Sequence, residues 1–170
     1  MRSGVALGAN LGDRLEALRT ARDALSSWSA TPEAVLSAPV YETDPVDCPD
    51  GSGAFYNSVV EIDFAGSPES LLERCTALEK AMGRPAARES DAPNAPRPID
   101  LDILYCNRRV LATERLTLPH PRLHLRRFVL EPLSRIRPHL VLPGMTATVR
   151  ELLEALQSSE PPLRLVAENW

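Results

Sequence analysis

The spacing of apolar residues along the first part of the chain predicts a strand, a helix and a second strand. Residues 5–8 form a short apolar run, and the glycines of residues 8–12 permit a sharp turn into a helix. Apolar residues then recur at helical spacing through residues 15–25. Residues 35–41 resemble a strand in which Pro39 indicates an edge or a bulge.

The middle of the chain continues with a strand, a helix, a loop and a further strand. Alternation over residues 55–64 predicts a half-buried strand with one apolar and one more polar face. A helix is expected to begin at Ser67, which is followed by a proline, and to end at Gly83. Residues 84–98 hold four prolines without periodicity and are expected to form a long loop, and the apolar run 99–105 is the clearest strand.

The last third of the chain favours two more helices, at residues 128–134 and 149–156, and residues 157–170 are expected to form a C-terminal tail. This order of elements predicts an α+β fold, a ferredoxin-like sandwich in which helices cover one face of an antiparallel sheet. Because 170 residues bury one core and no long linker interrupts them, we expect a single domain over residues 1–170.

The net charge of −4 hides an uneven distribution of charged residues. Residues 1–83 carry 6 basic and 13 acidic side chains, residues 84–137 carry 11 and 6, and residues 138–170 carry 2 and 4. All 11 basic residues of the middle segment are arginines, whose forked donors match phosphate oxygens. Neither a Gly-x-x-x-x-Gly-Lys nor a Gly-x-Gly-x-x-Gly pattern occurs, so phosphate binding is expected to depend on arginine, histidine and metal.

The positions of the cysteines and histidines indicate the cellular compartment of the protein and whether it has a zinc site. Three widely spaced cysteines, Cys48, Cys75 and Cys106, argue against a disulfide framework and a zinc ribbon. His120 and His124 are spaced for one helical face, but a third zinc ligand at a recognisable spacing is missing. No run approaches the ~20 apolar residues of a membrane span. We therefore expect a cytoplasmic protein with no membrane partner, and a monomer.

Two aspartates stand inside the clearest strand. Alternation places Asp100 and Asp102 on one face, with Cα atoms about 6.5 Å apart, while Ile99, Leu101 and Ile103 enter the core. A divalent cation would offset the repulsion between these carboxylates, and magnesium typically takes one or two carboxylates together with substrate phosphates and water. A solvated polar face on a half-buried strand is the alternative interpretation, and the pattern alone leaves both open.

Arginines flank the aspartate pair. Arg84 and Arg88 begin the preceding loop, and Arg97 ends it between two prolines. Such arginines can form surface salt bridges, which contribute about 1 kcal/mol or less each. A long proline-rich loop inside a compact domain is, however, typical of a functional lid.

Five motifs in this order carry a resemblance to a known family: Gly8-Ala9-Asn10-Leu11-Gly12, Tyr41-Glu42-Thr43-Asp44-Pro45, Phe55-Tyr56-Asn57, Arg97-Pro98-Ile99-Asp100-Leu101-Asp102 and Leu118-Pro119-His120-Pro121-Arg122. Over residues 4–156 the chain resembles the 6-hydroxymethyl-7,8-dihydropterin pyrophosphokinase family. The resemblance implies an enzyme of folate biosynthesis that transfers diphosphate from its co-substrate ATP to the hydroxymethyl pterin, giving the pterin diphosphate and AMP.

The resemblance also implies three sets of site residues. Those matching catalytic positions are Arg84, Arg97, Asp100 and Asp102, of which the two aspartates would bind two Mg²⁺ ions. Those matching positions that contact ATP are Ile103, Arg115, Thr117, His120 and Arg126. Those matching the pterin pocket are Thr43, Pro45, Val46, Phe55, Asn57 and Phe128, with the two phenylalanines on either side of the ring.

One departure from the family pattern concerns the loop. Residues 91–96 replace an aromatic residue and its basic neighbours, so closure over the pterin is expected to be weaker or differently made. A relative that binds ATP and pterin but has lost catalysis is therefore one alternative. An RNA-binding ferredoxin-like module is another, but its aromatic motif is missing and the pI near 5.4 opposes it, so no nucleic-acid partner is expected.

Overall fold

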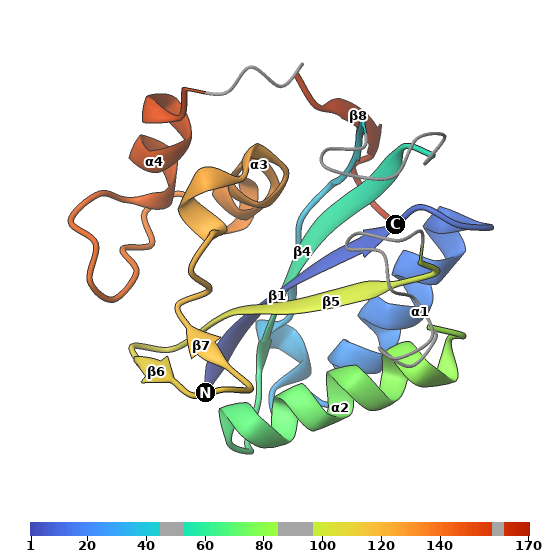
Figure 1. Cartoon of the computed structure of the whole chain (residues 1–170), viewed down its shortest axis with the longest axis horizontal. Helices are drawn as coiled ribbons and strands as arrows, with labels where there is room; N and C mark the ends of the chain where they lie inside the picture. Colours follow the sequence, from blue (N-terminus) through green and yellow to red (C-terminus); the bar gives the residue numbers. More distant parts are fainter. Residues whose placement is uncertain (45–52, 85–96, 158–161) are drawn as a thin grey trace.

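The computed structural model describes residues 1–44, 53–84, 97–157 and 162–170, and Figure 1 shows helices on either side of a twisted sheet. The elements in chain order are β1 (Arg2–Ala9), α1 (Arg14–Ser27), η1 (Pro32–Ala34), β2 (Leu36–Ser37), β3 (Val40–Thr43), β4 (Phe55–Asp63), α2 (Pro68–Ala81), β5 (Asp100–Cys106), β6 (Leu111–Ala112), β7 (Thr117–Leu118), η2 (Leu123–Leu125), α3 (Arg127–Ile136), α4 (Val149–Ala155) and β8 (Arg164–Ala167).

The main sheet has the strand order β5-β1-β4-β3-β8, and β2 pairs with β4 beside this path. All of these pairings are antiparallel, as is the separate ribbon of β6 and β7. The α+β sandwich of the ferredoxin-like kind expected from the sequence is therefore confirmed. The long central strands β1 and β4 pair along most of their lengths, from Arg2 with Asp63 to Ala9 with Tyr56.

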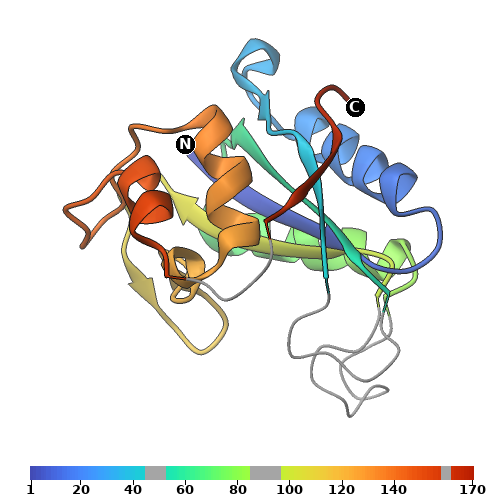
Figure 2. The ribbon, with the colours of Figure 1, turned by 90° about the horizontal axis from the view of Figure 1, so that it is seen from above.

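Helices cover both faces of this sheet, so the expectation that they cover one face is wrong (Figures 1 and 2). Residues of α1 and α2, such as Leu25 and Leu71, belong to one apolar cluster, and residues of α3 and α4, such as Leu130, belong to the other. The neighbouring residues Val59 and Val60 of β4 enter different clusters and are both fully buried. The half-buried alternation expected for this strand fails because the second helix layer covers its more polar face.

A β-bulge in β5 sets which side chains share a face. The register shifts between Gly4, which pairs with Tyr105, and Val5, which pairs with Ile103, so Leu104 is one additional residue. Leu104 and Tyr105 consequently both join the cluster under α3 and α4. The ring of Tyr105 lies over Gly4, where a Cβ atom would overlap it, so this close approach requires glycine.

The edge of the sheet differs from the sequence expectation in two places. Residues 35–41 form two short strands instead of one, because the chain leaves the ladder around Pro39 before β3 begins. The expected C-terminal tail contains β8, which pairs with β3 as the outermost strand. Trp170 follows β8 and donates from Nε1 to the carbonyl of Ala38 at 2.7 Å. The C-terminal segment therefore completes the sheet.

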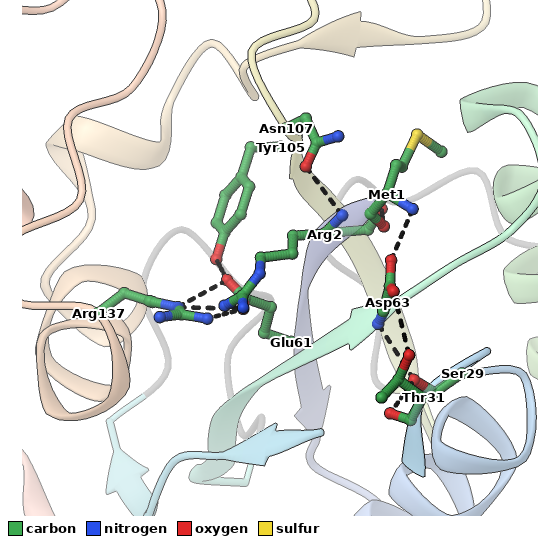
Figure 3. Close-up of polar contacts among 10 residues, drawn as sticks. Met1, Arg2, Ser29, Thr31, Glu61, Asp63, Tyr105, Asn107 and Arg137 are labelled. Carbon is green, nitrogen blue, oxygen red and sulfur yellow. Dashed lines mark hydrogen bonds and ion pairs between the residues drawn. The ribbon is translucent and has the colours of Figure 1, made fainter. Parts of the chain in front are cut away.

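A buried carboxylate connects the end of α3 to the sheet (Figure 3). Glu61 of β4 is 2% exposed and accepts a hydrogen bond of 2.6 Å from the Tyr105 hydroxyl. Arg137, directly after α3, donates from Nε to both carboxylate oxygens at 3.0 Å, and Arg2 approaches from the other side at 3.4 Å. Burial raises the pKa of Glu61, while the Tyr105 bond and the Arg2 charge oppose that rise.

The described residues also bear on the expectations for disulfides, zinc and membrane-spanning segments. Cys75 and Cys106 are buried free thiols, Cys48 lies outside the described residues, and burial raises the pKa of Cys75 to about 12. The segment holding His120 and His124 contains the short turn η2 instead of an α-helix. Within the described residues, no group of three or more metal-binding side chains occurs. None of the helices described there has the length and apolar character to cross a membrane.

Candidate active site

Two cavities meet at the aspartate pair of β5. The larger has a volume of about 430 Å³ and lies where β1, β3, β4 and β5 approach the N-terminal end of α3. The smaller, about 280 Å³, lies between β5 and residues 113–121. Asp100 lines the larger cavity, and Asp102 lines both. A single side chain of β5 therefore borders both spaces.

The larger cavity brings together four of the six residues expected at a pterin, namely Thr43, Phe55, Asn57 and Phe128. Pro45 and Val46, the other two, lie outside the described residues. Asn57 donates from Nδ2 to the Thr43 hydroxyl at 2.8 Å, which fixes the orientation of its amide. A Cβ atom at Gly8 would lie 3.2 Å from the amide oxygen of Asn57, so glycine at this position leaves the space that Asn57 occupies.

The smaller cavity gathers four of the five residues expected at ATP, namely Ile103, Arg115, Thr117 and His120. His120 is held to β5 because its backbone N–H donates to the Leu104 carbonyl at 2.8 Å. Arg126, the fifth, lines the larger cavity instead, where its guanidinium carbon lies 5.3 Å from the centre of the Phe128 ring. Its Nη1 also lies 3.6 Å from Asp102, so it stands beside the residue that borders both cavities.

Arginines already surround the aspartate pair. Arg84 and Arg97 approach Asp100 Oδ1 at 2.8 and 3.2 Å. The side chains of Asp100 and Asp102 are 30% and 43% exposed, so both reach the cavities. Burial, and then the negative charge of Asp100, raises the pKa of Asp102. The charge on Asp102 is thus incompletely compensated, and an additional cation would stabilise it.

The donor set of this site suits magnesium. The two aspartates lie on one face of β5 and offer only oxygen ligands, the type that magnesium prefers. Magnesium needs only one or two protein carboxylates when phosphates and water complete its shell, whereas zinc sites use several nitrogen or sulfur ligands. The residues present therefore fit a magnesium ion held jointly with a phosphate ligand.

Glu79 of α2 is a residue of this site that sequence reasoning missed. It is 7% exposed, and its Oε1 accepts a 2.8 Å bond from the backbone N–H of Leu101, between the two aspartates. The same oxygen pairs with the guanidinium of Arg84, which also contacts Asp100. Burial raises the pKa of Glu79. The available signal was a carboxylate within the apolar stripe of α2, four residues after the buried Cys75.

Asn10 and the C-terminal segment were also missed. Asn10 accepts a 2.8 Å bond from the backbone N–H of Arg97, and its own N–H donates to the Arg97 carbonyl at 3.3 Å. Asn10 belongs to the first motif of the resemblance, but the sequence alone does not indicate its contact with Arg97. Pro162, Leu163 and Arg164 line the larger cavity, and no sequence pattern predicts that the C-terminal segment reaches this site.

Comparison with known proteins identifies the family. The model of the 7,8-dihydro-6-hydroxymethylpterin-pyrophosphokinase (HPPK) family matches residues 4–138. The chain belongs to this family. It is 42% identical over 132 residues to the 2-amino-4-hydroxy-6-hydroxymethyldihydropteridine pyrophosphokinase of Bacillus subtilis (strain 168), covering 78% of this chain and 75% of the relative. The protein of that name from Methylorubrum extorquens is 39% identical over 160 residues, covering 93% of this chain and 95% of the relative.

Solved structures of the family share the fold. A crystal structure of an HPPK-DHPS protein in complex with substrates superposes with a TM-score of 0.67 at 12% identity and covers 91% of this chain. The wild-type HPPK-DHPS of Plasmodium falciparum with pteroate also gives 0.67, at 15% identity and 90% coverage. This chain spans less than half of either protein, 43% and 42%, and the low identities speak for the fold alone.

Family membership settles the broad function. Transfer of diphosphate from ATP to 6-hydroxymethyl-7,8-dihydropterin, a step of folate biosynthesis, is the activity of this family, and the function expected from the motifs is confirmed. The RNA-binding alternative is not favoured.

Proposed function

We propose that ATP occupies the smaller cavity, that the hydroxymethyl pterin occupies the larger one, and that the reaction takes place beside Asp102. The single observation that carries this assignment is that Asp102 lines both cavities, with Asp100 beside it in the larger one. The transferred phosphorus and the attacking hydroxyl must meet, and the shared wall is the place where two ligands from these cavities come into contact. Proximity and orientation then supply much of the rate enhancement.

The smaller cavity offers suitable contacts for a nucleotide. Ile103 presents an apolar side chain for the adenine, and Thr117 and His120 offer hydrogen-bonding groups beside it. The Arg115 side chain is 71% exposed and its ion pair with Glu73 is long, 3.9 Å, so it can turn toward phosphate at little cost. Arg126 stands at the aspartates, where phosphates entering from the smaller cavity would arrive.

The larger cavity offers two aromatic faces and one amide. Phe55 and Phe128 are proposed to stack on the flat pterin, which gains from burial and ring contact. The Asn57 amide provides a donor and an acceptor for the edge of the heterocycle, and Thr43 holds that amide in place. Pro45 and Val46 stay in the proposal as further contacts, although they lie outside the described residues.

Asp100 and Asp102 are proposed to hold two magnesium ions together with the phosphates of ATP. Bound there, magnesium neutralises phosphate charge and lowers the pKa of the acceptor hydroxyl. Arg84 and Arg97, both within 3.2 Å of Asp100, are proposed to turn from the carboxylate to the phosphates and to stabilise the transition state. Glu79 keeps Arg84 near the site during this exchange because it pairs with the same guanidinium.

The proposed chemistry is an in-line displacement at the β-phosphorus of ATP. The hydroxymethyl oxygen forms a bond to this phosphorus, the bond from the phosphorus to the α-phosphate oxygen breaks, and AMP leaves. Asp102 is proposed to assist removal of the hydroxyl proton, because it borders both cavities. Positioning and charge neutralisation supply the rest, so no covalent intermediate with the protein is needed.

The test is product analysis with ATP, magnesium and the hydroxymethyl dihydropterin. We expect AMP and the pterin diphosphate in equal amounts, with no ADP. ADP, or no product, contradicts the proposal. Tight binding of both substrates without AMP would instead identify a relative that has lost catalysis.

A binding experiment tests the metal. In a calorimetric titration, a nonhydrolysable ATP analogue should bind tightly only with magnesium, and the pterin should then bind to that complex. Equal binding of the analogue in chelator contradicts the magnesium assignment. The heat recorded at increasing magnesium concentration also separates one ion from two.

The setting of the enzyme forms part of the proposal. We propose a cytoplasmic monomer that binds no nucleic acid, which the buried free thiols of Cys75 and Cys106 and the net charge of −4 support. Light scattering should give one chain per particle, and a labelled single-stranded RNA should remain unbound at low salt.

A further inference from the structure

The C-terminal segment reaches the larger cavity because of the way β8 pairs with β3. Tyr41 pairs with Leu165 and Glu42 pairs with Arg164 in an antiparallel register. The next step of that register leads from Glu42 to Thr43 on one side and from Arg164 to Leu163 on the other. Leu163 therefore follows the strand toward a residue of the proposed pterin pocket.

The side chains at the start of β8 belong to the cavity wall. Pro162, Leu163 and Arg164 line the larger cavity together with Thr43 and Phe128. Leu163 is half-buried and offers hydrocarbon surface, which a flat heterocycle covers favourably when it binds. These residues lie well beyond residue 138, where the match to the family model ends, so the family match assigns them no role.

Arg164 fastens this segment to the end of β3. Its Nη2 donates to Asp44 at 3.0 Å and to Glu42 at 3.4 Å, on either side of Thr43 in the sequence. Glu42 also lies 3.8 Å from Arg14, whose Nη1 donates to the Ala54 carbonyl at 2.7 Å. The two arginines thus connect the end of β3 to the start of β4, the two places that supply Thr43 and Phe55.

The exposure of Arg164 limits what it does. Its side chain is 57% exposed, and exposed ion pairs contribute little to overall stability. An effect of Arg164 should therefore appear in the geometry of the adjacent cavity wall instead of in global unfolding.

We propose that Leu163 and Arg164 form the outer wall of the acceptor half of the active site and determine the affinity for the pterin. Leu163 contacts the heterocycle, and Arg164 is a positioning residue that holds Thr43 through Glu42 and Asp44. This inference rests on the assignment of the larger cavity to the pterin.

The experiment is steady-state kinetics of two variants with each substrate varied in turn. Leu163→Ala is expected to raise the KM for the pterin about 15-fold, because about two methylene-sized groups of this half-buried side chain leave the contact. Arg164→Gln is expected to raise the same KM about 3-fold, and Arg164→Lys to recover most of that loss because it keeps the charge. The KM for ATP and kcat should stay within twofold in all three.

Two matched controls separate a local wall from a general loosening of the C-terminal segment. Arg135→Gln removes an ion pair of similar exposure, 3.2 Å from Glu168, that fastens the same segment but does not line the cavity. Leu165→Ala truncates an exposed leucine of β8 that is also absent from the cavity wall. Both should leave the pterin KM unchanged. An equal rise in the controls overturns the inference.

The outcomes distinguish this inference from the proposed function. A wild-type protein that forms no AMP overturns the proposed function, and the inference with it. A wild-type protein that forms AMP, with an unchanged pterin KM in Leu163→Ala and Arg164→Gln, overturns the inference alone. Thermal melting by circular dichroism identifies a misfolded variant. If Leu163→Ala misfolds, Leu163→Val, which removes one methylene-sized group, serves as the folded replacement and should raise the pterin KM about 4-fold; an unchanged KM in that variant overturns the inference.

Discussion

Two of the clusters of carboxylates and arginines on this sheet differ in their exposure to solvent. Glu61 is 2% exposed and is surrounded by Arg137, Arg2 and the Tyr105 hydroxyl. Asp100 and Asp102 contact arginines too, but their side chains are 30% and 43% exposed and face cavities.

The difference shows what burial does to the same pair of chemical groups. If Arg137 were removed, the buried Glu61 would carry an uncompensated charge out of contact with water. The ion pairs of Glu61 are therefore expected to stabilise the fold. The aspartates are only half-buried and face cavities, so we propose that they can exchange an arginine for a metal ion at a lower cost than Glu61. The same residue types are therefore expected to stabilise the fold at one place and are proposed to bind ligands at the other.

The largest expected effect is on activity, from Asp100→Ala. Loss of one carboxylate of the proposed metal site should lower kcat by at least about 10³-fold, which corresponds to about 4 kcal/mol. The free energy of unfolding should fall by less than about 1 kcal/mol, because the lost ion pairs are partly exposed. AMP formation and urea denaturation measure the two quantities. If the Asp100→Ala variant is both inactive and substantially unfolded, Asp100 stabilises the fold and the predicted role in catalysis is contradicted.

The next effect is on stability, from Arg137→Ala. Removal of this partner leaves Glu61 buried and undercompensated, so the free energy of unfolding should fall by about 3 kcal/mol. Activity per folded molecule should remain within about threefold at low temperature, since Arg137 lines neither cavity. Arg135→Ala, which changes an exposed arginine in the last turn of α3, is the matched control and should be nearly neutral. An equal loss in both variants would contradict a special role for burial.

Glu79 is buried like Glu61 but contacts Arg84 beside the aspartates. Its substitution should therefore lower both kcat and the free energy of unfolding, each by a smaller amount. Glu79→Gln keeps an acceptor for the Leu101 N–H but loses the charge that holds Arg84, so kcat should fall about 10-fold, about 1.4 kcal/mol. Glu79→Ala should in addition lower the free energy of unfolding by about 1–3 kcal/mol, because the buried N–H loses its partner. Equal kinetics of the Gln variant and the wild type would remove Glu79 from the site.

The smallest effect concerns Glu151, a fully exposed carboxylate that forms no ion pair with an arginine of the described residues. Its bonds to Thr148 at the start of α4 lower its pKa. A lowered pKa means that its contribution to stability is present above the ordinary glutamate pKa of about 4.3 and is lost as the pH falls through the folded value. Glu151→Ala should therefore be slightly less stable than wild type at pH 7, and this gap should narrow toward pH 2. Urea titrations at both pH values measure it; a gap independent of pH contradicts the assignment.

Local patterns predicted the features that depend on local spacing. Alternation in β5 placed Asp100 and Asp102 on one face, and both line the larger cavity. The resemblance supplied residues far apart in sequence, such as Asn57 and Phe128, that the fold brings to that cavity. Pro39 correctly marked an interruption at the sheet edge.

Features that depend on tertiary partners were not predictable in this way. Glu79 interrupts an apolar stripe of α2, and no local pattern explains a carboxylate there. Its partners, Arg84 and the backbone N–H of Leu101, come close to it only in the folded chain. The polar residues of β4 indicated a solvent-facing side, because nothing local shows that Arg137 neutralises Glu61 under a second helix layer. The four residues of β8 carry no strong pattern of their own, and their pairing with β3 is the reason they form a strand.

The additional residue in β5 has one more consequence. Strict alternation would send Tyr105 to the side opposite Asp100 and Asp102, yet the bulge at Leu104 turns Tyr105 to the layer of α3 and α4, where it meets Glu61. One inserted residue thus changes the alternation of side chains between the half of the strand that carries the proposed catalytic aspartates and the half that contacts the layer of α3 and α4. Deletion of Leu104 should restore strict alternation, so that either the proposed catalytic pair or Tyr105 would lie on the opposite face of the sheet.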